Sequence, residues 1–226
     1  DLILKSMNST GADAFYGLSY KTIMSIHGGV ACFAAALGCI VMVHAAEMWS
    51  SGAGIFYRIQ SDRALCFAQL IDCVLFFAFG YLYLRYLDID FVGLLLTGSV
   101  AFASYSSIFP LAVLIILEVT HPRMRAIAMS FYNIVLAVSG DGLSPITTGA
   151  MADYLESHHI ATPFEALRYA MYVASGIVSL SVIAALFNVA HFTRDREAVR
   201  REISDSCASL TAMEEKDAPP SPVPCA

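Results

Sequence analysis

The chain has 226 residues, of which 58% are hydrophobic and 14% are charged, and its mean hydropathy is +0.65. Soluble domains carry roughly 25% charged residues, so this composition excludes an ordinary soluble protein and indicates an integral membrane protein. The net charge is −6 and the sequence has no basic face, which excludes nucleic acid as a partner.

The apolar runs predict an all-α fold, a multi-pass membrane helical bundle with about five transmembrane helices. Residues 1–17 are predicted to be a non-cytoplasmic loop, and the first span covers about 18–46. Gly28, Gly29 and Gly38 in this span predict close helix packing. His27 has two interpretations: a hydrogen bond within the bundle, or a role in handling protons or a ligand.

The second and third predicted spans, 64–86 and 91–119, are separated by a turn so short that they must be antiparallel neighbours. Asp72 lies about 12 Å into the second span at 1.5 Å per residue. The third span has a hydroxyl cluster that includes Ser104 and Ser107, ahead of Pro110. These serines either face an aqueous cavity or pack as small residues that bond back to the preceding turn.

The fourth predicted span, 125–153, contains a polar face. On a regular helix Asn133, Asp141, Ser144 and Thr148 share one side. Asp141 lies about 24 Å beyond the start of the span at 1.5 Å per residue, still within the hydrocarbon, where a carboxylate must be paired, protonated or facing water. Glycines flank it and a proline follows, so the backbone can bend there. These features predict a transmembrane helix that lines a polar path.

The last predicted span covers about 164–192, and residues 193–226 are predicted to be a cytoplasmic tail, largely disordered. Within it the charged stretch 193–206 is helix-prone, and the acidic, Pro-rich end 211–226 carries the predicted disorder. If the five spans alternate, eight arginines fall on the side of the tail and four basic residues fall on the other. This bias places the C-terminus in the cytoplasm. The adjacent His158 and His159 are a weak metal signal, and we expect no metal there.

The run THPRMRAIAMSFYNIVLAVSGDGLSPITTGAMAD, residues 120–153, resembles the eleventh helix of Spinster-like members of the major facilitator superfamily. In that family a proline and arginines precede the helix, and a Gly-Asp, Ser-Pro, Gly and Asp series runs through it. The resemblance extends more loosely over residues 18–200. It implies that the chain holds helices eight to twelve of a twelve-helix transporter, the C-terminal half of a partial major facilitator fold, with the N-terminal half as the missing partner.

The same resemblance implies which spans line the central cavity, namely helices eight, ten and eleven. The candidates for a transport path are therefore Asp141, Asn133, Ser144, His27, Ser104 and Ser107. For Asp72 we expect a structural role as an interhelical partner. Glu118 with Arg123 and Arg125 resembles a cytoplasmic charge cluster that latches the two halves of such transporters in one state, although a plain solvated turn remains the alternative.

Spinster-like proteins move lysolipids, sphingoid lipids or related amphiphiles, often with proton coupling, in plasma or endolysosomal membranes. The resemblance therefore implies a secondary transporter that works by alternating access, with the lipid bilayer, a lipid or small-molecule substrate and protons as its partners. Two alternatives stay open: a sugar, organic anion or drug as the substrate, and a truncated, non-transporting membrane protein. The sequence has no nucleophile–base motif and no metal-ligand spacing, so we expect no enzymatic activity, no metal and no cofactor.

Overall fold

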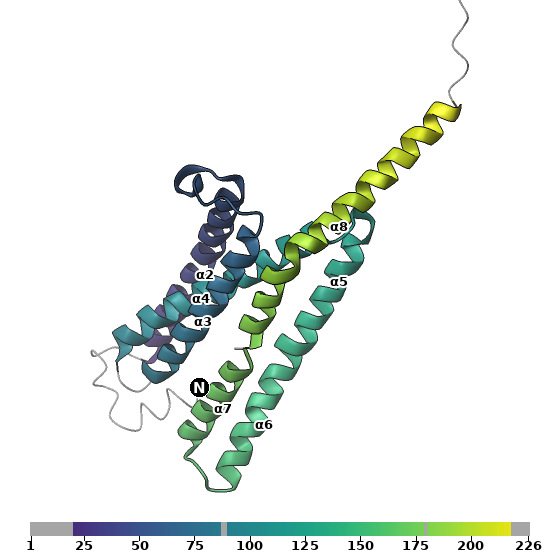
Figure 1. Cartoon of the computed structure of the whole chain (residues 1–226). Coiled ribbons are helices and arrows are strands. Elements are labelled where there is room, and N and C mark those ends of the chain that lie inside the picture. The colour runs from purple at the N-terminus through teal and green to yellow at the C-terminus, as the bar shows by residue number, and fades with distance from the viewer. Residues whose placement is uncertain (1–19, 87–89, 179, 218–226) are drawn as a thin grey trace, which may run out of the picture.

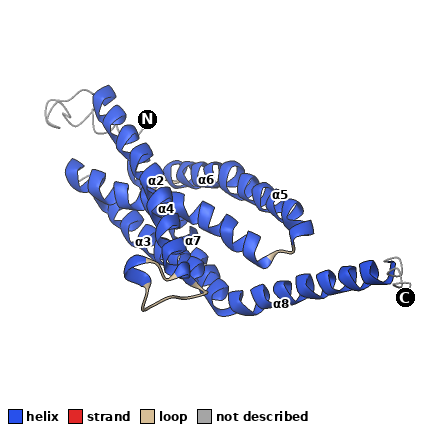
Figure 2. Ribbon diagram, turned by 90° about the horizontal axis from the view of Figure 1, so that it is seen from above, coloured by secondary structure: helices blue, strands red, loops and turns tan. Residues whose placement is uncertain are grey.

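The computed structural model describes residues 20–86, 90–178 and 180–217, and these residues form helices and connecting turns with no strand (Figures 1 and 2). The α-helices are α2 (Tyr20–Ser51), α3 (Ala64–Tyr86), α4 (Phe91–Val119), α5 (Arg125–Leu136), α6 (Ser144–Ser157), α7 (Pro163–Val178) and α8 (Leu180–Asp217). Short 3₁₀ turns lie at Gly54–Phe56 and Pro122–Met124. A π-helical segment, Ala137–Leu143, joins α5 to α6. The protein is thus an all-α helical bundle.

Within the described residues, four helical stretches are long and apolar enough to cross a membrane: Ser25–Ser51, Ala64–Tyr86, Phe91–Val119 and Glu165–Ser209. The sequence predicted about five. The predicted span 125–153 does not form one regular α-helix, because the π-helical segment divides it into α5, with 12 residues, and α6, with 14. The apolar helices that are long enough to cross a membrane support the prediction of a multi-pass membrane protein.

Helix α4 is the centre of the packing, because it lies against both α2 and α3 (Figure 1). Leu111 of α4 is fully buried with Ala46 of α2 and Ala68 of α3. Nearer the end of α4, Ile115 packs with Cys66 of α3 and Phe192 of α8. The core therefore joins α2, α3, α4 and the first half of α8.

Local capping defines where two of these helices begin. The carboxylate of Asp90 accepts hydrogen bonds from the backbone N–H groups of Val92 and Gly93 at the start of α4. Thr162 and Glu165 form a reciprocal capping box at the start of α7, with Thr162 N 3.1 Å from Glu165 Oε2 and Glu165 N 3.4 Å from Thr162 Oγ1. Each arrangement satisfies N–H groups that have no partner within the helix.

Helices α5 and α6 follow one another along a single line beside the bundle (Figure 1). α6 packs against α7, and α5 contacts α4. None of the described side chains of α5 and α6 is buried. Both the polar and the apolar face of this run are therefore largely uncovered by the described residues.

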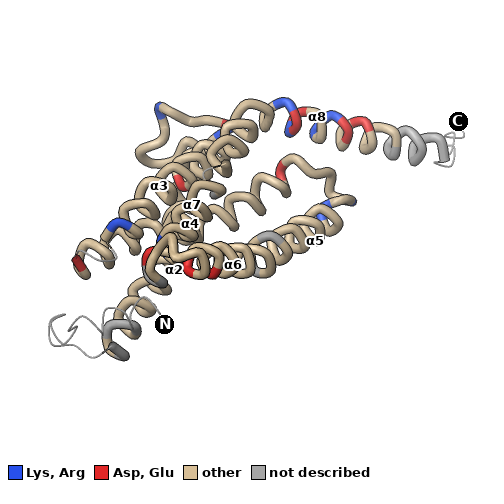
Figure 3. The backbone as a smooth tube through the Cα atoms, turned by 90° about the horizontal axis from the view of Figure 1, so that it is seen from below, with Lys and Arg blue, Asp and Glu red and all other residues tan. Residues whose placement is uncertain are grey.

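Helix α8 continues through residues 193–217 (Figure 2), which include the helix-prone stretch 193–206 and the first residues of the acidic, Pro-rich end 211–226. Residues 218–226 lie outside the described part of the chain. Figure 3 shows that acidic and basic residues alternate along this outer part of α8. Arg201 and Glu197 form an ion pair one turn apart, with Nη2 and Oε2 separated by 3.6 Å, and such pairs favour a helix in solvent.

The close packing that the glycines predicted occurs at Gly38 but not at Gly28 or Gly29. A Cβ added at Gly38 would lie 2.6 Å from the Cα of Ala103 in α4 and would overlap its carbonyl oxygen. At Gly28 and Gly29 an added Cβ meets no described atom within 4 Å. Gly38 is thus the point of closest approach between α2 and α4.

We expect Gly38→Ala to lower the stability of the protein by about 1–3 kcal/mol, because an extra carbon in a packed interface costs this much. Gly28→Ala is the matched control and should keep or raise stability, because alanine favours a helix by about 1 kcal/mol over glycine. Thermal unfolding of both variants in detergent, followed by circular dichroism, measures the difference. Equal midpoints for the two variants would show that α2 and α4 do not meet at Gly38.

Candidate functional site

The structure distributes the predicted site residues over three places, and the first contains His27. Its Nε2 lies 3.1 Å from the hydroxyl of Tyr83 in α3, and its ring stacks on the Tyr83 ring with centroids 5.9 Å apart. The Phe102 ring of α4 meets the His27 ring edge-on at 6.0 Å. His27 thus has the hydrogen-bonded arrangement within the bundle, and it links α2 to α3 and α4.

The second place is the interface between α3 and α4, where Ser104 and Ser107 are 4% and 0% exposed. Ser107 Oγ lies 2.6 Å from Oδ2 of Asp72, which is also fully buried. The same hydroxyl lies 3.1 Å from the carbonyl oxygen of Ala103 and 2.9 Å from that of Ser104. In this structure the two serines are interior packing residues rather than the lining of an open path, and Asp72 is an interhelical partner.

Two further polar contacts join the helices in the same region. The Cys39 thiol of α2 donates to the carbonyl oxygen of Ser106, with a separation of 3.2 Å. The Asn188 side chain of α8 donates to Oε1 of Gln69 in α3, with a separation of 3.0 Å. Polar groups inside an apolar bundle gain stability from such pairs because the alternative is an unsatisfied buried group.

The third place is the run α5–α6, which carries Asn133, Asp141 and Ser144. Asn133 lies in α5 and is exposed, and Ser144 is the first residue of α6 and is also exposed. The backbone of Asp141 lies within the π-helical segment, and its side chain lies outside the described part of the structure. π-Helical segments inside longer helices are frequent at functional sites, and the exposed Asn133 and Ser144 flank this one on its two sides.

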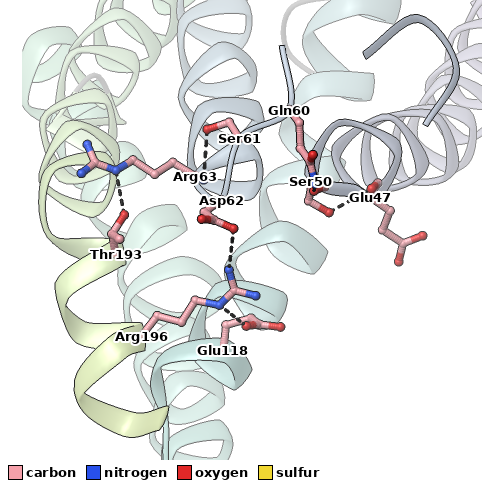
Figure 4. Close-up of polar contacts among 9 residues, drawn as sticks. All are labelled: Glu47, Ser50, Gln60, Ser61, Asp62, Arg63, Glu118, Thr193 and Arg196. Atoms are coloured by element: carbon pink, nitrogen blue, oxygen red, sulfur yellow. Dashed lines mark hydrogen bonds and ion pairs between the residues drawn. The ribbon is translucent and has the colours of Figure 1, made fainter. Parts of the chain in front are cut away.

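A cluster of mostly charged residues joins the middle of α8 to the end of α4 and to the two residues that precede α3 (Figure 4). Nη1 of Arg196 lies 3.5 Å from Oδ1 of Asp62, and its Nε lies 2.8 Å from Oε2 of Glu118. The Nε–H of Arg196 does not have hydrogen-bond alignment, so the contact with Glu118 is an ion pair. Arg63 Nε donates to Oγ1 of Thr193 with a separation of 2.8 Å. We call these five residues the end cluster.

The loop before α3 is held in place beside the end cluster (Figure 4). Gln60 donates from Nε2 to the carbonyl oxygen of Ser50 with a separation of 3.0 Å. The indole N–H of Trp49 donates to the carbonyl oxygen of Ile59 with a separation of 2.6 Å, and the Trp49 ring stacks on Phe67. These contacts fix the position from which Asp62 and Arg63 reach α8.

The partner of Glu118 differs from the predicted one. The sequence grouped Glu118 with Arg123 and Arg125, which lie nearby in the chain. In the structure both arginines are exposed, and the Nε of Arg125 donates to the carbonyl oxygen of Thr120 at 3.4 Å. Arg196 was missed as the partner because it is distant in sequence. The sequence could have indicated this pairing, because Asp62 and Arg63 directly precede one apolar span and Arg196 closely follows the last one, on the same predicted side of the membrane.

The structure also describes the surroundings of the histidine pair. The ring of His158 lies 4.2 Å from that of Tyr154, and its Nδ1 is 2.9 Å from the Tyr154 carbonyl oxygen. His159 has a φ of 53°, in the left-handed region, at the end of α6. Among the described residues no three His, Cys, Asp or Glu side chains gather in a way that could hold a metal ion.

Comparison with models of known protein families finds no match, and comparison with curated proteins finds none. The resemblance to Spinster-like transporters therefore stays an interpretation of residues 120–153. The structure itself has three features that bear on function. These are a packed unit of α2, α3 and α4, an uncovered run α5–α6 with a π-helical segment, and the end cluster at one end of the bundle.

We expect Arg196→Ala to reduce stability by about 1 kcal/mol, because it removes two ion pairs and the packing of its stem. The Arg196 side chain is only 21% exposed, and its guanidinium carbon lies 5.9 Å from the centre of the Phe192 ring. Arg194→Ala is the matched control, since Arg194 is 79% exposed and pairs only with its neighbour Asp195 among the described contacts. Arg194→Ala should change the stability of the protein by no more than about 0.5 kcal/mol.

A double-mutant cycle of Arg196→Ala with Glu118→Gln, followed by thermal unfolding in detergent, measures the pair directly. We expect a coupling energy of about 0.5–1 kcal/mol, as found for side chains in contact. Additive effects of the two substitutions would mean that Glu118 and Arg196 do not interact in solution.

Proposed function

We propose that this chain is the C-terminal part of a secondary active transporter that moves a lysolipid, a sphingoid lipid or a similar amphiphile by alternating access. The observation that carries the proposal is the run α5–α6, whose regular helix is replaced by a π-helical segment at Asp141. Transporter helices are commonly interrupted where substrate or coupling ions bind near the bilayer midplane. The Spinster-like resemblance of residues 120–153 points to the same helix.

Irregular backbone is tolerated at membrane depth where it lies within protein or lines a water-filled cavity. The seven residues Ala137–Leu143 lie between two α-helices of 12 and 14 residues, so they fall in the middle of the run. In a π-helix the backbone hydrogen bonds are shifted from the α pattern, which changes the direction of the following side chains. This geometry supports a polar path that passes the middle of the run.

The side chains of the run match a substrate with a polar head and an apolar chain. Asn133 and Ser144 are exposed polar groups, while Phe131, Ile134 and Ile146 are exposed by 68%, 61% and 67%. An amphiphile can place its headgroup against the polar groups and its acyl chain against the apolar ones. A sugar would meet only the polar part of this surface.

The end cluster supports the conformational part of the proposal. Asp62 and Glu118 are 79% and 41% exposed, and ion pairs in such positions contribute little to stability. Contacts of this strength can break and re-form during a conformational cycle. In the proposed transporter Glu118 and Arg196 hold α8 against α4 in one state, at the cytoplasmic side, and Arg123 and Arg125 remain available to the missing half.

Proton-driven uptake of a labelled lysolipid into vesicles tests the proposal, with the complete polypeptide that contains this chain. We expect Asp141→Asn to reduce uptake by about tenfold or more, which corresponds to a rise of roughly 1.4 kcal/mol in the activation free energy. The reason is that, in the proposed mechanism, Asp141 or His27 changes its protonation as the cavity switches sides. Asp153→Asn is the matched control, because Asp153 is an exposed carboxylate at the far end of α6, and it should leave uptake unchanged.

The outcomes of this assay separate the alternatives. Uptake of a sugar or an organic anion without uptake of lysolipid would contradict the proposed substrate class but support the proposed transport activity. A purified protein that forms a stable dimer and transports none of these compounds would overturn transport and favour an assembly protein that buries the uncovered faces of α5 and α6.

A further inference from the structure

The contact between Asp72 and Ser107 lies deep in the bundle, where an ionisable side chain indicates more than a packing role. Asp72 is eight residues into α3, about 12 Å at 1.5 Å per residue. Ser107 is twelve residues before the end of α4, about 18 Å by the same rise. Both side chains are 0% exposed. An ionisable group at this depth in a membrane helix marks a functional site unless its charge is compensated.

No charge compensates Asp72 in the described structure. Neither oxygen of its carboxyl group forms an ion pair with a described Lys, Arg or His, and Oδ1 has no hydrogen-bond partner at all. Its one polar partner is the hydroxyl of Ser107. A buried ionised carboxylate needs several donors, and without them burial costs several kcal/mol.

The groups around Asp72 on each neighbouring helix are neutral or engaged elsewhere. The next residue along α3 is Cys73, and Gln69 one turn earlier is bonded to Asn188 of α8. On α2 the thiol of Cys39 donates to Ser106, and His27 is bonded to Tyr83.

Helix α7 meets α3 through Tyr172, which contacts Tyr81, nine residues beyond Asp72. Arg168, the basic residue of α7, lies one turn before Tyr172 and forms no described ion pair with Asp72. In the end cluster Arg196 pairs with Asp62 and Glu118, and Arg63 donates to Thr193. Among the described residues the interface therefore offers Asp72 a hydroxyl and no cation within ion-pair distance.

The single hydrogen of Ser107 limits the direction of the Asp72–Ser107 bond. Ser107 Oγ lies within 3.1 Å of three oxygen atoms: Oδ2 of Asp72 and the carbonyl oxygens of Ala103 and Ser104. A hydroxyl group has one hydrogen and can also accept, whereas a carbonyl oxygen only accepts. If the Ser107 hydrogen goes to a helix carbonyl, as is common for serine in helices, the hydrogen between Ser107 and Asp72 must come from Asp72.

We propose that Asp72 and Ser107 form a proton-binding site inside the bundle, in which the protonated carboxyl group of Asp72 donates to Ser107 Oγ and Ser107 donates to the α4 backbone. This arrangement leaves no net charge in the interface and gives every hydrogen an acceptor. The ionised form would leave a buried carboxylate with a single donor. Release of the proton therefore requires water to reach the interface between α3 and α4.

The proposal holds whether or not the chain is a transporter, because it depends only on burial and hydrogen-bond geometry. If the chain is one, the bound proton is a candidate for the coupling ion, at a residue other than Asp141. A sodium ion is the competing ligand, since carboxylate, hydroxyl and carbonyl oxygens also suit that cation.

Infrared difference spectroscopy of the purified protein at pH 7, wild type against Asp72→Asn, tests the site. The expected result is a carbonyl stretch of a protonated carboxyl group in the wild type that is missing from Asp72→Asn. Asp62→Asn is the matched control, because Asp62 is 79% exposed, and it should leave the band intact. A carboxylate band in place of the protonated one, or a thermal stability that rises with sodium chloride but not with choline chloride, would overturn the proposal.

A second variant keeps the test decisive if Asp72→Asn fails to fold. Ser107→Ala removes the acceptor of the Asp72 proton, so the protonated carboxyl band should remain and move to higher frequency. An unchanged band frequency would show that the proton of Asp72, if present, is not donated to Ser107, and would overturn the proposal.

Discussion

A carboxyl group enclosed in an apolar helix interface constrains this structure more strongly than its other contacts. Asp72 is fully buried, and its one polar partner among the described residues is Ser107, 2.6 Å away on α4. Sliding α3 along α4 by one residue, about 1.5 Å, would break this contact and leave a buried polar group without a partner. Apolar neighbours such as Leu111 and Ala68 tolerate small shifts and volume-conserving changes far better. The polar pair therefore fixes the register of α3 against α4.

The same turn of α4 also determines how α2 packs. Within residues 103–107, Ala103 meets Gly38, the carbonyl oxygen of Ser106 accepts from Cys39, and Ser107 meets Asp72. Short side chains in this turn allow helices on two sides to approach the α4 backbone. A larger residue here would separate α4 from α2, from α3 or from both. The hydroxyl cluster in the sequence is thus explained by close packing on two sides of one helix.

The sequence predicts the elements of this fold better than their partners. The bounds of α3 and α4 coincide with the second and third predicted spans, because long apolar runs bounded by charged or polar residues determine where such helices begin and end. The pairing of Asp72 with Ser107, and of Glu118 with Arg196, depends on the register between helices, which hydropathy does not contain. The glycines and the proline around Asp141 indicated a change in the helix, but a π-helical segment depends on local hydrogen bonding that composition does not specify. The charged stretch 193–206 is helix-prone in the sequence and is helical in α8, but the end of α8 at Asp217 does not follow from the acidic, Pro-rich composition of 211–226.

Buried and exposed polar contacts divide the molecule into parts with different freedom to move. Fully separating α3 from α4 would expose a buried carboxyl and several apolar side chains, so α2, α3 and α4 should move as one unit, and water can reach Asp72 only through a local opening between α3 and α4. The ion pairs of Arg196 are partly exposed, and breaking them has a small cost in water. The run α5–α6 has no described buried side chain and touches the rest mainly through α7 and α4. A conformational change that preserves the buried contacts must therefore occur by moving α5, α6 and α8 against the fixed unit of α2, α3 and α4, and the π-helical segment lies in the part that moves.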